Sequence, residues 1–163
     1  MAGNAELVAL LIERGLTIAV AESLTGGKLV AALVDVPGAS ATVLGGVVAY
    51  NTALKASVLG VSASLLATRG AVDPEVARQM AAGVRTALAV DGRPADVGLA
   101  TTGVAGPESQ DGQPVGTVFV GIAIGDRVES VALRLSGSRG DIQSAAVDAA
   151  MATLLGLLNE PQE

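Results

Sequence analysis

The stretch from Ile18 to Lys28, IAVAESLTGGK, is the part of the sequence that most limits the fold. A short apolar run of β type, Thr17 to Ala21, turns abruptly polar and small before a long apolar segment begins at Leu29. This order predicts a strand, a tight turn and a helix. In α/β proteins such a turn lies at the carboxyl end of the strand, where the next helix presents free backbone N–H groups. We therefore expect Ser23 at a ligand-binding edge, as a helix cap, a phosphate ligand or a nucleophile.

The remaining segments predict an α/β fold. Helical and β-type segments alternate at first, and a hairpin turning at Gly125-Asp126 comes late. This pattern is typical of a mixed, mostly parallel sheet with helices on both faces. The predicted helices cover 4–14, 26–35, 62–68, 74–90 and 140–158, with a short one after Asn51, and the predicted strands cover 16–21, 43–50, 95–101, 117–124 and 128–135.

The absence of two residue types restricts the chemistry. The 163 residues, which suit one domain, include no His and no Cys. A Ser-His-Asp triad, a thiol nucleophile and a zinc site of His or Cys ligands are therefore excluded. Any proton transfer by a side chain must use Lys, Tyr, an acid or a hydroxyl group.

Charge and hydropathy indicate where the protein works and what it binds. The net charge is −6, and one Phe and one Tyr are the only aromatic residues, so we expect no nucleic-acid partner. No signal peptide is recognisable at the N-terminus, which favours a cytoplasmic location. The apolar runs Leu29–Val36 and Val43–Val48 are too short to span a membrane, and we expect no membrane association.

Four polar features lie at the ends of predicted strands. Because the carboxyl ends of parallel strands meet at one edge of a sheet, we expect these features to share a site. They are Glu22-Ser23 with Thr25-Gly26-Gly27, Tyr50 with Lys55, Thr101-Thr102-Gly103, and Ser136 to Arg139.

Ser23 and its surroundings allow more than one function. An isolated Ser before a helix is most often a cap or turn residue. The TGGK that follows is not a phosphate-binding Walker A loop, because Glu22 and Leu29 stand where that motif needs Gly and Ser or Thr. A nucleophilic Ser23 needs a base, and without His the candidates are Lys55, Tyr50 and nearby acids. Lys55 is then either a solvated surface residue or a partly buried amine whose pKa is lowered toward neutrality.

The other polar groups have the same two interpretations. Tyr50 is either an aromatic plug at a strand end or a group that relays a proton, and Arg139 is either a surface residue or an anion ligand. Backbone N–H groups near the glycines could hold a phosphate or form an oxyanion hole. The residues that we expect to bind substrate are Glu22, Thr25, Gly26, Gly27, Thr101, Thr102, Gly103, Gly106 and Arg139.

Several motifs, in order along nearly the whole chain, resemble the CinA C-terminal domain family. This family comprises competence-damage-inducible proteins and stand-alone nicotinamide-nucleotide amidases. The motifs are AESLTGG (21–27), DVPGAS (35–40), GGVVAYNTALK (45–55), GVAGP (103–107) with PVGTVFVG (114–121), and SGSRGDI (136–142).

The resemblance implies a three-layer α/β/α fold in a single domain covering residues 1–163, without the larger N-terminal domain that many family members carry. The implied reaction is deamidation of nicotinamide mononucleotide to nicotinate mononucleotide and ammonia, in pyridine nucleotide recycling, with no metal and no cofactor. The family's serine, tyrosine and lysine fall on Ser23, Tyr50 and Lys55, and its glycine-rich ligand loops fall on Thr25–Gly27 and Thr102–Gly106. We expect Lys55 to deprotonate Ser23, the N–H groups near Gly26 and Gly27 to stabilise the oxyanion, and a homodimer.

The sequence departs from the family pattern in four places. Leu24 replaces a common Cys, and ESQDGQ replaces a glycine run after Pro107. Ser138 replaces an acid and Gln143 replaces a frequent second Arg, which weakens the expected phosphate clamp. Two other functions stay open, namely a phosphate-ligand-binding module without catalysis and an interaction protein associated with competence or DNA repair.

Overall fold

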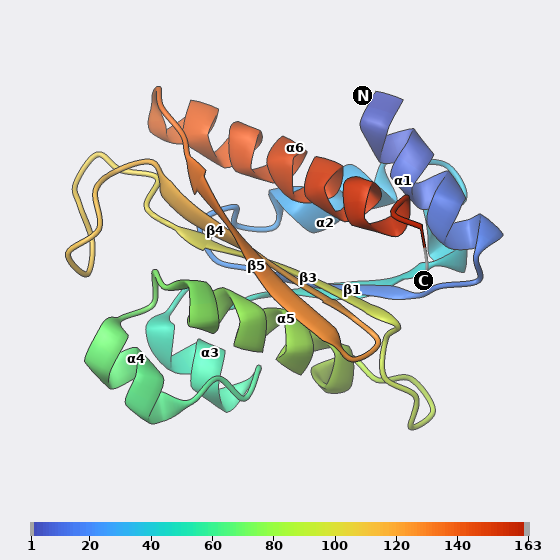
Figure 1. The fold of residues 1–163 in the computed structure, drawn as a ribbon, viewed down its shortest axis with the longest axis horizontal. Helices are drawn as coiled ribbons and strands as arrows, with labels where there is room; N and C mark the ends of the chain where they lie inside the picture. Colours follow the sequence, from blue (N-terminus) through green and yellow to red (C-terminus); the bar gives the residue numbers. More distant parts are fainter. Residues whose placement is uncertain (1, 162–163) are drawn as a thin grey trace.

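A five-stranded mixed sheet forms the centre of the molecule (Figure 1). In the computed structural model, which describes residues 2–161, the strand order is β2-β1-β3-β4-β5. β2, β1 and β3 are parallel, and β4 pairs antiparallel with β3 and with β5. The strands are β1 (Ile18–Glu22), β2 (Val43–Val48), β3 (Val97–Gly103), β4 (Thr117–Ile124) and β5 (Arg127–Arg134).

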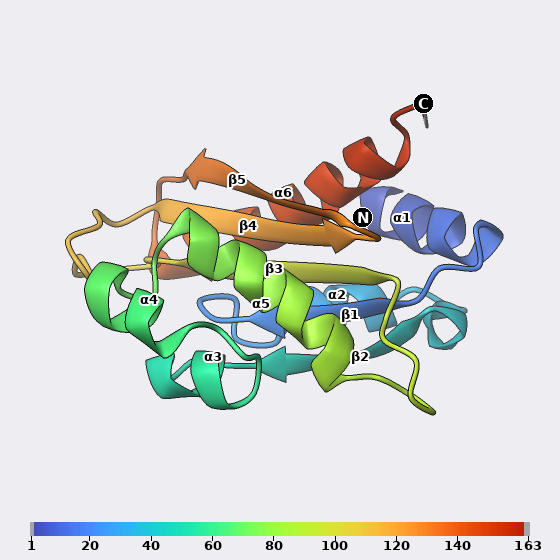
Figure 2. The same ribbon diagram turned by 60° about the horizontal axis from the view of Figure 1, so that its bottom comes forward.

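Helices lie on both sides of this sheet (Figures 1 and 2). One side carries α1 (Ala2–Glu13), α2 (Lys28–Val34) and α6 (Arg139–Leu158), and the other carries α3 (Thr52–Ser57), α4 (Ala63–Arg69) and α5 (Pro74–Ala87). A short 3-10 turn, Ala39–Ala41, precedes β2. The predicted α/β fold class, with its three layers and mixed sheet, is confirmed.

Side-chain caps determine where most helices begin. Asn51 accepts the Ala53 N–H at the start of α3, and Asp73 accepts two N–H groups at the start of α5, with Pro74 in the first helical position. Ser138 and Asp141 form a reciprocal capping box at the start of α6. These contacts are short-range in sequence, which is why the helix starts were predictable.

The predicted end of α5 at Val90 is wrong. The helix ends at Ala87, and the Val90 N–H and C=O pair instead with the backbone of Arg93. Asp91 and Gly92 make the turn between them with positive φ values of 51° and 76°. The Asp-Gly pair suits such a turn and stops the helix early.

The two faces of the sheet bury different kinds of side chain. Toward α1, α2 and α6 the strands present large branched residues such as Val20, Leu99 and Ile122. Toward α5 they present alanines and glycines. A Cβ placed on Gly98 would lie 1.9 Å from the Ala81 carbonyl oxygen of α5, so the helix backbone packs directly on the strand.

Two apolar runs considered in the sequence analysis are too short to span a membrane, but helix α6 was not considered there. At 20 residues, it is long and apolar enough to cross a membrane by length and composition. Core helices of folded domains pass the same test, and α6 is one of them, since it packs on the sheet and against α1 and α2. Its buried residues are Ile142, Ala146, Val147, Ala150, Met151, Leu154 and Leu158.

Candidate active site

Ser23 and Lys55 meet at the carboxyl ends of two neighbouring parallel strands. Ser23 directly follows β1, and Lys55 lies on α3, just after β2. At this end of the two strands, Glu22 of β1 pairs with Val48 of β2. The Lys55 Nζ lies 2.9 Å from Ser23 Oγ. Both side chains are buried, with exposed fractions of 1 % for Lys55 and 8 % for Ser23. The structure therefore brings together the hydroxyl and the amine that the sequence analysis paired.

The surroundings of Lys55 favour its neutral form. Burial lowers the pKa of Lys55 from 10.5 to about 8, against an opposing effect of the negative charge of Asp111. The lowered pKa raises the share of molecules that carry a neutral amine at this position near neutral pH. Nζ also donates a hydrogen bond to the Ala49 carbonyl oxygen at 2.7 Å, which holds the amine in place. A neutral Lys55 can accept the Ser23 proton at this distance.

The role of Asp111 predicts a shift in pH dependence. If Lys55 is the base, activity rises with pH through the Lys55 pKa, and Asp111→Asn lowers that pKa because the carboxylate favours the ammonium form. The rising limb of a pH profile of kcat/KM should therefore move to lower pH. Asn keeps an oxygen that can accept the Ala71 N–H, which Asp111 accepts at 3.1 Å. A limb that stays in place or moves to higher pH would contradict the assignment.

Glu22 occupies the helix end that sequence analysis assigned to a ligand. Its side chain is fully buried, and its carboxylate accepts the N–H groups of Gly27, Leu29 and Val30 at 3.2, 2.8 and 3.1 Å. The negative charge also stabilises the N-terminus of α2. Glu22 therefore caps the helix from within the protein and is not free to bind substrate.

The turn after Ser23 offers different N–H groups from those predicted. The Gly26 N–H donates to the Ser23 carbonyl oxygen at 3.1 Å, and the Gly27 N–H is bound to Glu22, so the prediction that these two groups hold an oxyanion is wrong. Within residues 2–161, the N–H groups of Leu24 and Thr25 have no hydrogen-bond partner. Thr25 is fully buried, whereas Leu24 lines a pocket beside Ser23, so the Leu24 N–H is the one that a ligand can approach.

The threonines of the predicted site, Thr25, Thr101 and Thr102, make hydrogen bonds within the protein. Thr25 Oγ1 and Thr101 Oγ1 share a buried hydrogen bond of 2.8 Å, which links the turn to β3. Thr102 Oγ1 donates to the Ala71 carbonyl oxygen at 2.7 Å. Thr101 is 0 % exposed and Thr102 is 1 % exposed. Their hydroxyl groups are therefore engaged inside the protein.

A pocket of about 180 Å³ opens beside Ser23. Tyr50 lies at its rim, 62 % exposed, and accepts a hydrogen bond from the Arg139 guanidinium at 3.1 Å. Arg139 also donates to the Gly106 carbonyl oxygen, and so joins the start of α6 to the loop after β3. The lining residues are Ser23, Leu24, Tyr50, Gly103, Val104, Ala105, Gly106, Glu108, Gln110 and Arg139.

Three features of the site, Glu108, Gln110 and the charge of Asp111, were not predicted from the sequence. All three belong to the long loop between β3 and β4, and loops of this length in compact domains are usually functional. The positions of individual side chains in such a loop depend on contacts with distant segments. The contact of Asp111 with the Gly70-Ala71 segment is one of these.

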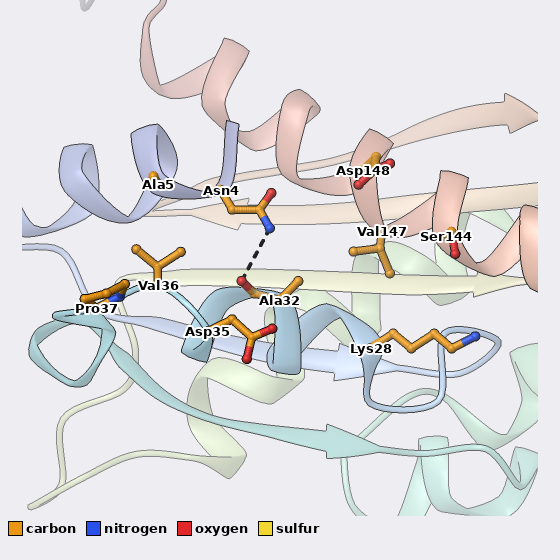
Figure 3. Close-up of a pocket in the computed structure, with 10 residues that line it drawn as sticks. All are labelled: Asn4, Ala5, Lys28, Ala32, Asp35, Val36, Pro37, Ser144, Val147 and Asp148. Atoms are coloured by element: carbon orange, nitrogen blue, oxygen red, sulfur yellow. Dashed lines mark hydrogen bonds between the residues drawn. The ribbon is translucent and has the colours of Figure 1, made fainter. Parts of the chain in front are cut away.

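A larger hollow of about 440 Å³ lies between α1, α2 and α6 (Figure 3). Asn4 donates to the Ala32 carbonyl oxygen across it, and Lys28, Asp35 and Asp148 stand along its walls. It contains no pair of hydroxyl and base at hydrogen-bond distance, so the smaller pocket is the candidate active site. Among the described residues, no group of three or more Asp or Glu side chains is placed to hold a metal ion.

The family model and the similar proteins all indicate the same family. The sequence model described as the CinA C-terminal domain matches residues 2–158. A CinA-like protein of Frankia casuarinae is 50 % identical over 145 residues, which are 89 % of this chain and 32 % of that protein. A putative competence-damage inducible protein of Desulforamulus reducens is 48 % identical over 87 % of this chain and 33 % of its own length. The chain thus spans about a third of the length of these relatives.

Solved structures agree with the sequence matches. A CinA superfamily protein from Klebsiella pneumoniae superposes with a TM-score of 0.90 at 34 % identity, covering 96 % of both chains. One from Escherichia coli gives 0.89 at 34 % identity, covering 95 % of this chain and 88 % of that one. In sequence and in fold, this chain belongs to the CinA C-terminal domain family.

Proposed function

We propose that the protein is an amidase that converts nicotinamide mononucleotide to nicotinate mononucleotide and ammonia. The observation that carries this proposal is the buried pair of Ser23 Oγ and Lys55 Nζ at 2.9 Å, in a chain without His or Cys. A hydroxyl next to an amine with a lowered pKa is a way to activate a nucleophile. The pair opens on a pocket with a cationic side chain, which suits a substrate that carries an anionic group.

The geometry supports a two-step reaction. Neutral Lys55 takes the Ser23 proton while Oγ attacks the carboxamide carbon, and the N–H group of Leu24, which lines the pocket, stabilises the developing oxyanion. Protonated Lys55 then gives its proton to the departing nitrogen, the C–N bond breaks, and ammonia leaves an ester on Ser23. Water attacks this ester, Lys55 removes the proton of the water, and it returns a proton to Ser23 as the acid leaves. Each oxyanion donor contributes about 3–4 kcal/mol in comparable enzymes.

Arg139 is the proposed phosphate ligand. Because Glu22 already fills the N-terminus of α2, the phosphate cannot use that helix end. Arg139 is at the rim of the pocket, next to Tyr50, and its guanidinium can bind a phosphate with two hydrogen bonds. Tyr50 is proposed to orient Arg139 and to assist proton transfer at the rim.

Ammonia release from three substrates tests the function. We expect nicotinamide mononucleotide to react faster than nicotinamide riboside and free nicotinamide, because only the mononucleotide carries the phosphate. Arg139→Met should raise KM for the mononucleotide about 10-fold or more and leave KM for the riboside unchanged. Arg93→Met, in the exposed turn after α5, is the matched control.

The other candidate functions predict different results in the same assay. Binding of the mononucleotide without ammonia release would identify a ligand-binding module. If the protein neither binds the mononucleotide nor releases ammonia from it, an interaction protein is favoured. The competence-damage names of the relatives suggest the same function.

The proposed assembly is a cytoplasmic homodimer. β2 forms one edge of the sheet and carries no charged residue. Four apolar or aromatic side chains on or just after this strand are exposed by 40 % or more, which suits contact with a second copy: Val48, Tyr50, Leu54 and Val58. Light scattering after size-exclusion chromatography measures the mass, and a mass of one chain would contradict this assembly.

A further inference from the structure

Glu108 is a charged residue of the pocket beside Ser23 that has no task in the proposed reaction. It belongs to the stretch ESQDGQ, where this chain departs from the glycine run of its family. We propose that Glu108 is a specificity-determining residue, whose carboxylate binds a cationic ring and so selects a pyridinium amide over an uncharged one. The inference rests on the proposed function, because it concerns the ring that carries the carboxamide attacked by Ser23.

Glu108 has no partner inside the protein. Within residues 2–161, its carboxylate forms no ion pair and accepts no hydrogen bond. Two other acids of the same region are engaged, since Asp111 accepts the Ala71 N–H and Asp141 caps α6. The side chain of Glu108 is exposed and lines the pocket, so a ligand can reach its carboxylate.

The pocket keeps a positive and a negative charge apart. Arg139 donates to the Tyr50 hydroxyl and to the Gly106 carbonyl oxygen, which are both uncharged, and it forms no ion pair with Glu108. A ligand in this pocket of about 180 Å³ therefore meets two opposite charges. Since an acid next to a phosphate weakens its binding, the matching ligand carries its anionic group at Arg139 and a cationic group at Glu108.

The backbone that carries Glu108 is anchored on both sides. On its N-terminal side, the Gly106 carbonyl oxygen accepts from Arg139, and on its C-terminal side, Asp111 Oδ2 accepts the Ala71 N–H at 3.1 Å. Figure 2 shows this loop between β3 and β4 near α4, the helix that precedes Ala71. The loop therefore presents Glu108 to the pocket from a segment whose ends are both held.

Nicotinamide mononucleotide has a charge pattern that matches this pocket. Its pyridinium ring is cationic, its phosphate is anionic, and the ribose separates the two. With the carboxamide at Ser23 and the phosphate at Arg139, the ring lies between them, where Glu108 can contact it. The ring keeps its positive charge throughout the reaction, so Glu108 stabilises the substrate and the transition state equally. Glu108 should therefore affect KM and leave kcat almost unchanged.

A matched pair of ligands tests the role of the ring charge. Benzamide riboside monophosphate has carbon in place of the ring nitrogen, so it keeps the carboxamide, ribose and phosphate but has no ring charge. Ser23→Ala protein allows Kd to be measured by titration calorimetry without turnover. In this background, we expect Glu108→Gln to raise Kd for nicotinamide mononucleotide about fourfold and to change Kd for the benzamide nucleotide by less than about 1.5-fold. Gln keeps an oxygen that can accept a ribose hydroxyl, so the difference between the ligands reports the charge.

Salt and a second glutamate provide the controls. The difference between the two ligands should shrink in about 0.5 M sodium chloride, because an exposed charge pair is screened. Glu13→Gln removes the same charge from the exposed end of α1, which leads into the amino end of β1 and not to the Ser23 end. It should leave both Kd values unchanged. In otherwise wild-type protein, Glu108→Gln should raise KM for ammonia release about fourfold, with kcat within about twofold.

The outcomes separate this inference from the proposed function. If the wild-type protein releases no ammonia, but Glu108→Gln weakens binding of the mononucleotide alone, the amidase is refuted and the role of Glu108 is supported. If ammonia is released and Glu108→Gln changes both Kd values equally, the amidase stands and the inference is overturned. It is also overturned if neither Kd changes, if Glu13→Gln has the same effect as Glu108→Gln, or if the mononucleotide does not bind.

Discussion

Replacing Ser23 with alanine is expected to lower the rate of ammonia release by about 10⁴-fold or more, because the variant retains no nucleophile. Lys55→Met should cost a similar factor, since it removes the amine that is hydrogen-bonded to Ser23 Oγ. Lys55→Arg should not rescue activity, because a guanidinium stays protonated at any working pH. Steady-state ammonia assays on purified variants measure these effects.

A double variant tests whether Ser23 and Lys55 act as one unit. Residues that act together lose activity non-additively, so Ser23→Ala/Lys55→Met should be about as slow as either single variant. Ser130→Ala on β5, far from the pocket in the sheet order, is the matched control and should keep wild-type activity. If folded Ser23→Ala protein kept a tenth of the wild-type rate, the nucleophile assignment would be wrong.

A large effect on stability is expected at Gly98, where helix α5 lies directly on strand β3. Gly98→Ala places a Cβ 1.9 Å from the Ala81 carbonyl oxygen, and neither backbone can move without disturbing the layer. We expect the free energy of unfolding to fall by about 3 kcal/mol or more, the upper range of overpacking effects. For a chain of this size that is a drop in Tm of about 10 °C, measurable by calorimetry.

Gly156 in α6 provides the control for this substitution. No atom lies within 4 Å of a Cβ added there, and the residue is inside a regular helix. Gly156→Ala should therefore be neutral or raise the stability by up to about 1 kcal/mol. If the free energy of unfolding of Gly98→Ala were within about 1 kcal/mol of the wild-type value, α5 and β3 could separate at little cost, which would contradict this prediction.

What could be predicted from the sequence depends on how far apart the interacting residues are. Helix starts followed from caps two or three residues away, as at Asn51 and Asp73. Glu22 was misassigned because its carboxylate caps a helix through groups five to eight residues further on, a spacing outside the usual cap patterns. The proximity of Ser23 and Lys55 was inferred from strand ends, but the burial that lowers the Lys55 pKa is a property of the whole fold.

Gln143 is a second residue whose contacts could not be predicted, because its partner is distant in the sequence. Its sequence suggested only a lost cation, since nothing near it in the chain indicates a contact with Leu24. The contact exists because α6 packs beside α2, which brings residues 119 positions apart within hydrogen-bond distance. A contact between such distant residues becomes visible only when the layers are assembled.

The buried carboxylate of Glu22 has a consequence for the energetics of ligand binding. Three backbone contacts and complete burial mean that the Ser23 side of the pocket has little conformational entropy left to lose when a ligand arrives. Another part of the pocket wall, with Tyr50, Glu108 and Gln110, consists of exposed side chains on a rim and a long loop. The entropic cost of binding is therefore concentrated in that wall, and loop substitutions should alter affinity while the geometry of the attacking group stays constant.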